Sequence, residues 1–94
     1  MSDEGGGELG RKLSQLDGWS VRDGALEKSF ECGDFAGAMA FLGRIAAAAE
    51  EADHHPDVSI SWGTVTLRWV THSAGGITDA DLRMATASDG LARG

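Results

Sequence analysis

The 94-residue sequence has one cysteine, one proline and no tyrosine. Its only cysteine, Cys32, cannot form a disulfide within the chain, so we expect a reducing, cytoplasmic compartment and a buried structural thiol. No apolar run reaches the roughly 20 residues that a membrane-spanning helix needs, so we expect no membrane association. Basic residues are also few: 8 Lys and Arg stand against 15 Asp and Glu, giving a formal net charge of -7. A surface this acidic disfavours binding to nucleic acids and to anionic membranes.

The length of the chain is enough for one domain with a single modest core. Residues 1–7 are acidic and glycine-rich and carry no apolar stretch, so we expect a flexible N-terminus and no signal peptide there. Residues 8–94 are then expected to form the single domain.

Hydrophobic periodicity predicts an alternation of helices and strand pairs. The elements expected from it are a helix over 8–16, strands over 19–22 and 25–31, a helix over 35–52, strands over 58–62 and 64–69, and a last helix that begins at Thr78 and frays at 88–90. Asp23-Gly24 favours a tight turn between the first two strands, and Asp34 is a suitable N-cap for the long helix. The segment from Thr78 to Asp81 fits a capping box.

The predicted order is α-β-β-α-β-β-α, in which each strand pair is an antiparallel hairpin. The simplest fold for this order is an α+β domain, a four-stranded antiparallel sheet with helices packed on one face. The edges of such a sheet can pair with a second copy. Together with three tryptophans and an alanine-rich helix, these edges favour a homo-oligomer.

All three histidines lie where predicted elements end. His54 and His55 follow the long helix, and the only proline comes directly after them and disfavours helix at the residue before it. His72 comes just after the last strand. The fold can therefore bring the three histidines together at one end of the sheet with Glu50, from the helix end, and Asp81, from the start of the last helix.

Such a cluster suits proton transfer, because free imidazole titrates at about pH 6.5. A positioned general acid or base contributes about 10²–10⁴ in rate, and two could act on opposite sides of a substrate. Other interpretations remain open: a solvated helix end for His54 and His55, an ordinary strand-end residue for His72, and a simple helix cap for Asp81. A metal site is a further alternative, although adjacent histidines point apart in an extended segment. No Gly-x-Ser-x-Gly motif supports a nucleophilic mechanism.

The residues around the cluster resemble a known family over about residues 16–88. The resemblance is carried by Glu50-x-x-x-His54-His55-Pro56, Trp62, Thr71-His72, Gly76 and Asp81. Together they are similar to the signature of the pterin-4a-carbinolamine dehydratases. The resemblance implies dehydration of 4a-hydroxytetrahydrobiopterin to quinonoid dihydropterin, which recycles the cofactor of aromatic amino acid hydroxylases. It also implies that no metal or organic cofactor is needed, and that the protein is a homodimer or homotetramer.

The same resemblance implies roles for individual residues. His54 and His72 would act as general acid and base, in either order, and His55 would bind and orient the pterin. Glu50 would support the cluster electrostatically. Asp81 would orient His72, cap its own helix, or do both.

The roles of two tryptophans remain open, and the protein has one alternative function to consider. Trp62 would be either a wall of the pterin cleft or a core aromatic residue, and Trp19 is open in the same way. Animal members of the family also act as dimerisation cofactors for a homeodomain transcription factor, and some relatives are assembly factors. The alternative is thus a non-catalytic protein-interaction module, which would use the helical surface and would not need the histidines.

Overall fold

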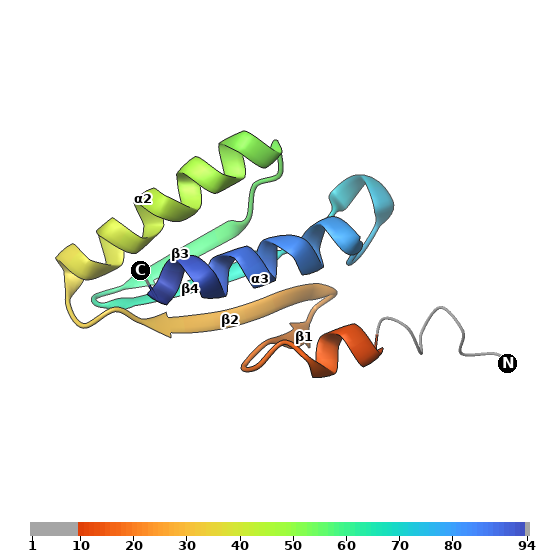
Figure 1. Cartoon of the computed structure of the whole chain (residues 1–94), viewed down its shortest axis with the longest axis horizontal. Helices are drawn as coiled ribbons and strands as arrows, with labels where there is room; N and C mark the ends of the chain where they lie inside the picture. Colours follow the sequence, from red (N-terminus) through yellow and green to blue (C-terminus); the bar gives the residue numbers. More distant parts are fainter. Residues whose placement is uncertain (1–9, 94) are drawn as a thin grey trace, which may run out of the picture.

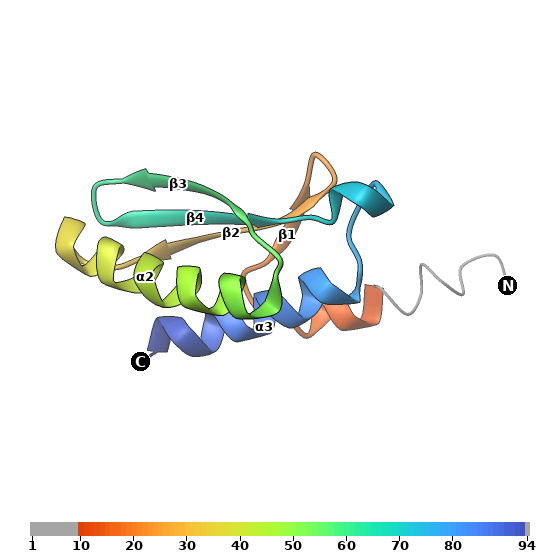
Figure 2. The same ribbon diagram turned by 90° about the horizontal axis from the view of Figure 1, so that it is seen from above.

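A computed structural model describes residues 10–93 of the chain (Figure 1). In order, its elements are a helical turn at 10–14, β1 (Ser20–Arg22), β2 (Ala25–Glu31), α2 (Phe35–Ala52), β3 (Asp57–Ser61), β4 (Thr64–Trp69), the 3-10 turn η1 (His72–Ala74) and α3 (Asp79–Arg93). The strands form one antiparallel sheet, and the helices cover one of its faces (Figure 2). The predicted α+β class and element order are confirmed. The expected flexible segment at 1–7 and the start of the first helix at 8–9 lie outside the described residues.

The sheet has the strand order β1-β2-β4-β3, so β2 and β4 join the two hairpins at its centre. Their register pairs Leu26 with Trp69 and Phe30 with Val65. Successive side chains of a strand point to opposite faces, and these four, with Leu67, are buried on the face that the helices cover. This face holds the core.

Helix α2 has the predicted bounds of 35–52. It begins at the predicted cap, where Asp34 accepts a hydrogen bond of 2.8 Å from the backbone N–H of Gly37. It ends at Asp53, which takes a left-handed conformation with φ 54°. The helix packs through a stripe at helical spacing, made of Ala38, Phe41, Ile45 and Ala49. Among the described residues, no helix has both the length and the hydrophobicity to cross a membrane.

Helix α3 does not fray at 88–90, so that prediction is wrong. Ser88 is fully buried and accepts a hydrogen bond of 3.1 Å from the Trp69 indole N–H. Asp89 accepts from the Trp19 indole at 3.1 Å and from the Lys28 ammonium at 2.8 Å. Long-range partners thus anchor a run of residues that is polar in sequence. Trp19, only 8% exposed, is a core residue.

Trp62 is not a core aromatic residue, which was one of the two roles predicted for it. Strand β3 ends one residue earlier, and Trp62 begins the β3–β4 turn with φ 59° and 87% of its surface exposed. The turn packs closely against the loop before α2, where a Cβ on Gly63 would lie 2.9 Å from the backbone of Gly33. The β3–β4 turn therefore lies near the N-terminal end of α2, far along the sheet from the end where α2 leads into β3 (Figure 1).

Cys32 is half-buried just after β2, less buried than predicted, and its Sγ lies 3.7 Å from the carbonyl oxygen of Phe30. Burial raises the pKa of the Cys32 thiol, an effect that Arg44 opposes and Glu31 reinforces. A thiol with a raised pKa is mostly un-ionised at neutral pH and therefore a poor nucleophile. This agrees with the structural role expected for it.

Candidate active site

His54 and Asp81 form the centre of the histidine cluster. His54 follows the C-cap of α2, and its backbone N–H donates to the carbonyl of Ala49 at 3.1 Å. Its side-chain Nε2 lies 2.6 Å from Oδ1 of Asp81, in the first turn of α3. The Asp81 side chain has no exposed surface, and the His54 side chain is 19% exposed. The contact therefore ties the end of α2 to the start of α3 at the edge of the core.

The second carboxylate oxygen of Asp81 accepts hydrogen bonds as well. Oδ2 accepts one hydrogen bond of 2.7 Å from the Thr71 hydroxyl and another of 2.8 Å from the backbone N–H of Thr78. The second contact is the capping interaction expected at the start of α3. Burial by itself acts to raise the pKa of Asp81, but the hydrogen bonds from His54, Thr78 and Thr71 outweigh it and hold that pKa below its usual value. Asp81 is therefore ionised at neutral pH.

An ionised Asp81 fixes the tautomer of His54. A carboxylate can only accept hydrogen bonds, so Nε2 of His54 carries the proton that joins the pair. The other ring nitrogen, Nδ1, carries no proton in this tautomer and has no hydrogen-bond partner among the described residues. One face of the imidazole stacks on the Trp69 indole, with ring centroids 5.7 Å apart and 24° between the planes. The ring is thus held at both its edge and its face.

His55 points away from its neighbour, as expected for adjacent residues in an extended segment. Its Nε2 lies 2.7 Å from Oε2 of Glu50, and both side chains are largely exposed, at 54% and 77%. Glu50 therefore supports His55. This second pair lies on the solvent side of the cluster, where a ligand could meet it.

His72 is exposed at the first position of η1. Its carbonyl oxygen accepts a hydrogen bond of 3.0 Å from the N–H of Gly75, whereas its side chain has no hydrogen bond or ion pair with the described residues. The residue before it, Thr71, donates to Asp81 and forms an isolated bridge with Gly76, which closes the loop. His72 therefore lies at the same end of the sheet as His54. Asp81 bonds His54 and not His72, which corrects the pairing expected from the sequence.

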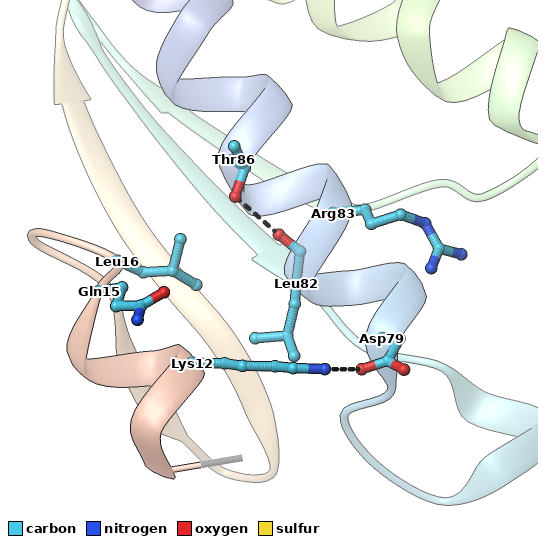
Figure 3. Close-up of a pocket in the computed structure, with 7 residues that line it drawn as sticks. All are labelled: Lys12, Gln15, Leu16, Asp79, Leu82, Arg83 and Thr86. Carbon is cyan, nitrogen blue, oxygen red and sulfur yellow. Dashed lines mark hydrogen bonds and ion pairs between the residues drawn. The ribbon is translucent and has the colours of Figure 1, made fainter. Parts of the chain in front are cut away.

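A hollow of about 500 Å³ lies elsewhere, between residues 12–16 and α3 (Figure 3). Lys12 reaches across it to Asp79, with 3.0 Å between Nζ and Oδ1. Leu16 and Leu82 supply its apolar surface, and none of the three histidines lines it. The hollow does not contribute to the histidine cluster.

Comparison with known proteins identifies the family. Residues 6–91 match the family model described as pterin 4 alpha carbinolamine dehydratase. The chain belongs to this dehydratase family. A relative from Mycolicibacterium vanbaalenii, provisionally named as this dehydratase, is 48% identical over 79 residues, which cover 84% of this chain and 85% of the relative. A relative from Thermosynechococcus vestitus, named in the same provisional way, is 42% identical and covers 90% of each chain.

Two solved structures of pterin dehydratase type share the fold. One, described as a transcriptional coactivator/pterin dehydratase from Brucella melitensis, superposes with a TM-score of 0.86 at 35% identity and covers 92% of this chain and 94% of its own. The other is a pterin dehydratase-like protein identified as a RuBisCO assembly factor in the alpha-carboxysome. It has a TM-score of 0.64 at 28% identity and covers 79% of this chain and 86% of its own. The family fold therefore occurs in proteins described with different roles.

The lowered pKa of Asp81 makes a prediction about acid stability. A carboxyl group whose pKa is lower in the folded than in the unfolded protein stabilises the fold above its unfolded value, about 4. This stabilisation is lost as the pH falls through the lower, folded value. We expect the difference in unfolding free energy between wild type and Asp81→Asn to shrink toward the acid end. Urea unfolding from pH 6 downward measures it, and a difference that is independent of pH would contradict the ionised state of Asp81.

Proposed function

We propose that this protein is a 4a-hydroxytetrahydrobiopterin dehydratase, which converts pterin-4a-carbinolamine to quinonoid dihydropterin and water. The observation that supports this best is the His54–Asp81 pair, in a chain of the dehydratase family. Asp81 holds one imidazole nitrogen and leaves the other for proton transfer. Activity of this kind supports tetrahydrobiopterin recycling beside an aromatic amino acid hydroxylase.

The proposed reaction needs one proton removed and one supplied. A base takes the proton from the ring nitrogen next to carbon 4a, and the electron pair released forms a carbon–nitrogen double bond. The hydroxyl group leaves from carbon 4a with a proton from the acid, as water. His54 and His72 take these two roles, each worth about 10²–10⁴ in rate. His55, held by Glu50 at 2.7 Å, binds and orients the pterin.

A coupled assay tests the proposal. An aromatic amino acid hydroxylase generates the 4a-hydroxypterin, and ultraviolet absorbance follows its dehydration with and without this protein. We expect acceleration that is abolished in the double variant His54→Ala/His72→Ala. Folded wild type that gives no acceleration would reject the dehydratase assignment.

His72→Ala alone should lower turnover at least about tenfold, because it removes one of the two proton-transfer groups. The unfolding free energy should change by less than about 0.5 kcal/mol, since His72 is exposed and not part of the core. Steady-state kinetics and urea unfolding measure the two quantities. Unchanged turnover in the folded variant would exclude His72 from the mechanism.

Treatment with EDTA should leave turnover unchanged, because the proposed chemistry uses side chains only. Among residues 10–93, no three His, Cys, Asp or Glu side chains lie close enough to share a metal ion. The assay is the same coupled reaction after dialysis against the chelator. Loss of activity that zinc restores would favour the metal site instead.

A homodimer or homotetramer in the cytoplasm is part of the proposal. Phe35 and Met39 lie one turn apart on α2, and their side chains are 57% and 45% exposed. Large apolar side chains that lie together on the surface are typical of a protein–protein contact. The lone cysteine favours the reducing compartment. Sedimentation velocity tests the assembly, and a monomer at micromolar concentration would contradict it.

The second candidate is a protein-interaction module on the same scaffold. The relatives described as a coactivator and as an assembly factor favour it, as does the exposed apolar surface of α2. This role would survive the double variant His54→Ala/His72→Ala. A folded wild type that lacks dehydratase activity would therefore favour this candidate.

A further inference from the structure

Helix α3 contributes buried polar side chains to the core. Among residues 10–93, the buried polar or charged residues are Asp81 and Ser88, and both have no exposed surface. Asp81 bonds His54 directly. Ser88 lies seven residues further along α3, on the same side of the helix. It bonds Trp69, the residue on which His54 stacks.

The hydrogen bonds of Ser88 have a defined direction. Its hydroxyl donates a hydrogen bond of 2.7 Å to the carbonyl oxygen of Met84, one helical turn earlier. The oxygen then accepts from the Trp69 indole N–H at 3.1 Å. Trp69 has no exposed surface, and its N–H would be left unpaired without Ser88. A buried donor without a partner is costly, so this bond sets the rotation of the indole plane.

The same plane supports His54. The centroids of the imidazole and indole rings are 5.7 Å apart, and the two planes are inclined by 24°. Asp81 fixes the edge of the imidazole at Nε2, and Trp69 fixes its face. Helix α3 thus determines the placement of His54 twice, once directly through Asp81 and once through Ser88 and Trp69.

We propose that Ser88 and Trp69 are positioning residues for His54. By fixing the indole plane, they keep the imidazole on Asp81 and present Nδ1 for proton transfer. For turnover the inference rests on the proposed dehydratase function, whereas for the geometry of His54 it does not.

A purely structural role, in which the Trp69–Ser88 bond only joins α3 to the sheet, can be distinguished with a matched control. Trp19 also donates its indole N–H to α3, at Asp89, the residue next to Ser88. It packs edge-on against Phe30 in the core and bonds no histidine. Trp19→Phe therefore removes an equivalent bond between an indole and α3 without affecting His54.

The experiment compares Ser88→Ala, Trp69→Phe and Trp19→Phe. The readouts are kcat and KM in the coupled assay and the imidazole ¹⁵N chemical shifts of His54, which report its tautomer and hydrogen bonding. We expect Ser88→Ala to lower kcat about tenfold by misplacing the imidazole, with KM changed less than about twofold. The His54 signals should move in Ser88→Ala and Trp69→Phe and stay in place in Trp19→Phe.

The inference is overturned if Ser88→Ala and Trp69→Phe keep the wild-type His54 signals and kcat. It is also overturned if Trp19→Phe reproduces their losses, because the effect is then general to the core. If Ser88→Ala does not fold, Trp69→Phe decides alone, since it keeps an aromatic ring under His54. If wild type shows no dehydratase activity, the proposed function fails and the His54 signals alone decide the positioning role.

Discussion

Replacing Asp81 with Asn should lower kcat at least about 100-fold. The carboxylate holds Nε2 of His54 in its protonated form, 2.6 Å away. An amide can instead donate to Nε2, which moves the ring proton to Nδ1 and so changes the protonation of the nitrogen that takes part in the proposed proton transfer. The variant should also lose about 1–3 kcal/mol of unfolding free energy, because Thr71 and the backbone N–H of Thr78 lose a charged acceptor in a buried site.

Asp79→Asn is the matched control for this variant. Asp79 lies in the same first turn of α3, but its side chain is 68% exposed and pairs with Lys12 on the surface. Removing its charge should change the unfolding free energy by less than about 1 kcal/mol, and turnover should remain at the wild-type level. Steady-state kinetics and urea unfolding of both variants make the comparison. Equal turnover in the two would mean that Asp81 is only a helix cap.

The elements that the sequence predicted best are those with local signals. The bounds of α2 follow from the cap at Asp34 and from the proline after His55, which are both read within a few residues. The position of the three histidines at one end of the sheet also follows from element order. The sequence does not predict which histidine bonds to Asp81. His54 is 27 residues away from Asp81, and only the packing of α3 against α2 brings the two together.

Long-range pairing also explains the errors. Ser88 and Asp89 resemble a fraying helix end in sequence, and partners from β2, β4 and the segment before β1 hold them in place. Trp62 continues the alternation of a strand, yet close packing of its turn against the loop before α2 ends the strand one residue earlier. In the sequence, Thr71 stands out only as part of the Thr71-His72 motif. Its contact with Asp81 could have been suspected from its place beside His72, but the sequence alone does not specify that bond.

Gly37→Ala should lower the unfolding free energy by about 2–4 kcal/mol, a large effect for a single methyl group. A Cβ at this position would lie 2.2 Å from the carbonyl oxygen of Cys32, which is backbone and cannot rotate away. It would also lie 3.2 Å from Oδ1 of Asp34, the atom that caps α2 through the N–H of Gly37. The loop and the cap must therefore shift together, and loss of a cap alone costs about 1 kcal/mol.

Gly43→Ala provides the opposite expectation in the same helix. A Cβ at Gly43 meets nothing within 4 Å, so the change should stabilise the protein by about 0.5–1 kcal/mol through helix propensity alone. Urea unfolding at a fixed protein concentration measures both variants. Destabilisation by both substitutions would contradict the open surroundings of Gly43, and tolerance of Gly37→Ala would contradict the close approach to Cys32.

Because Gly37 lies at the opposite end of α2 from His54, the folded fraction of Gly37→Ala should keep wild-type turnover. A loss of stability without a loss of turnover per folded molecule would separate the scaffold at the start of α2 from the chemistry at its end.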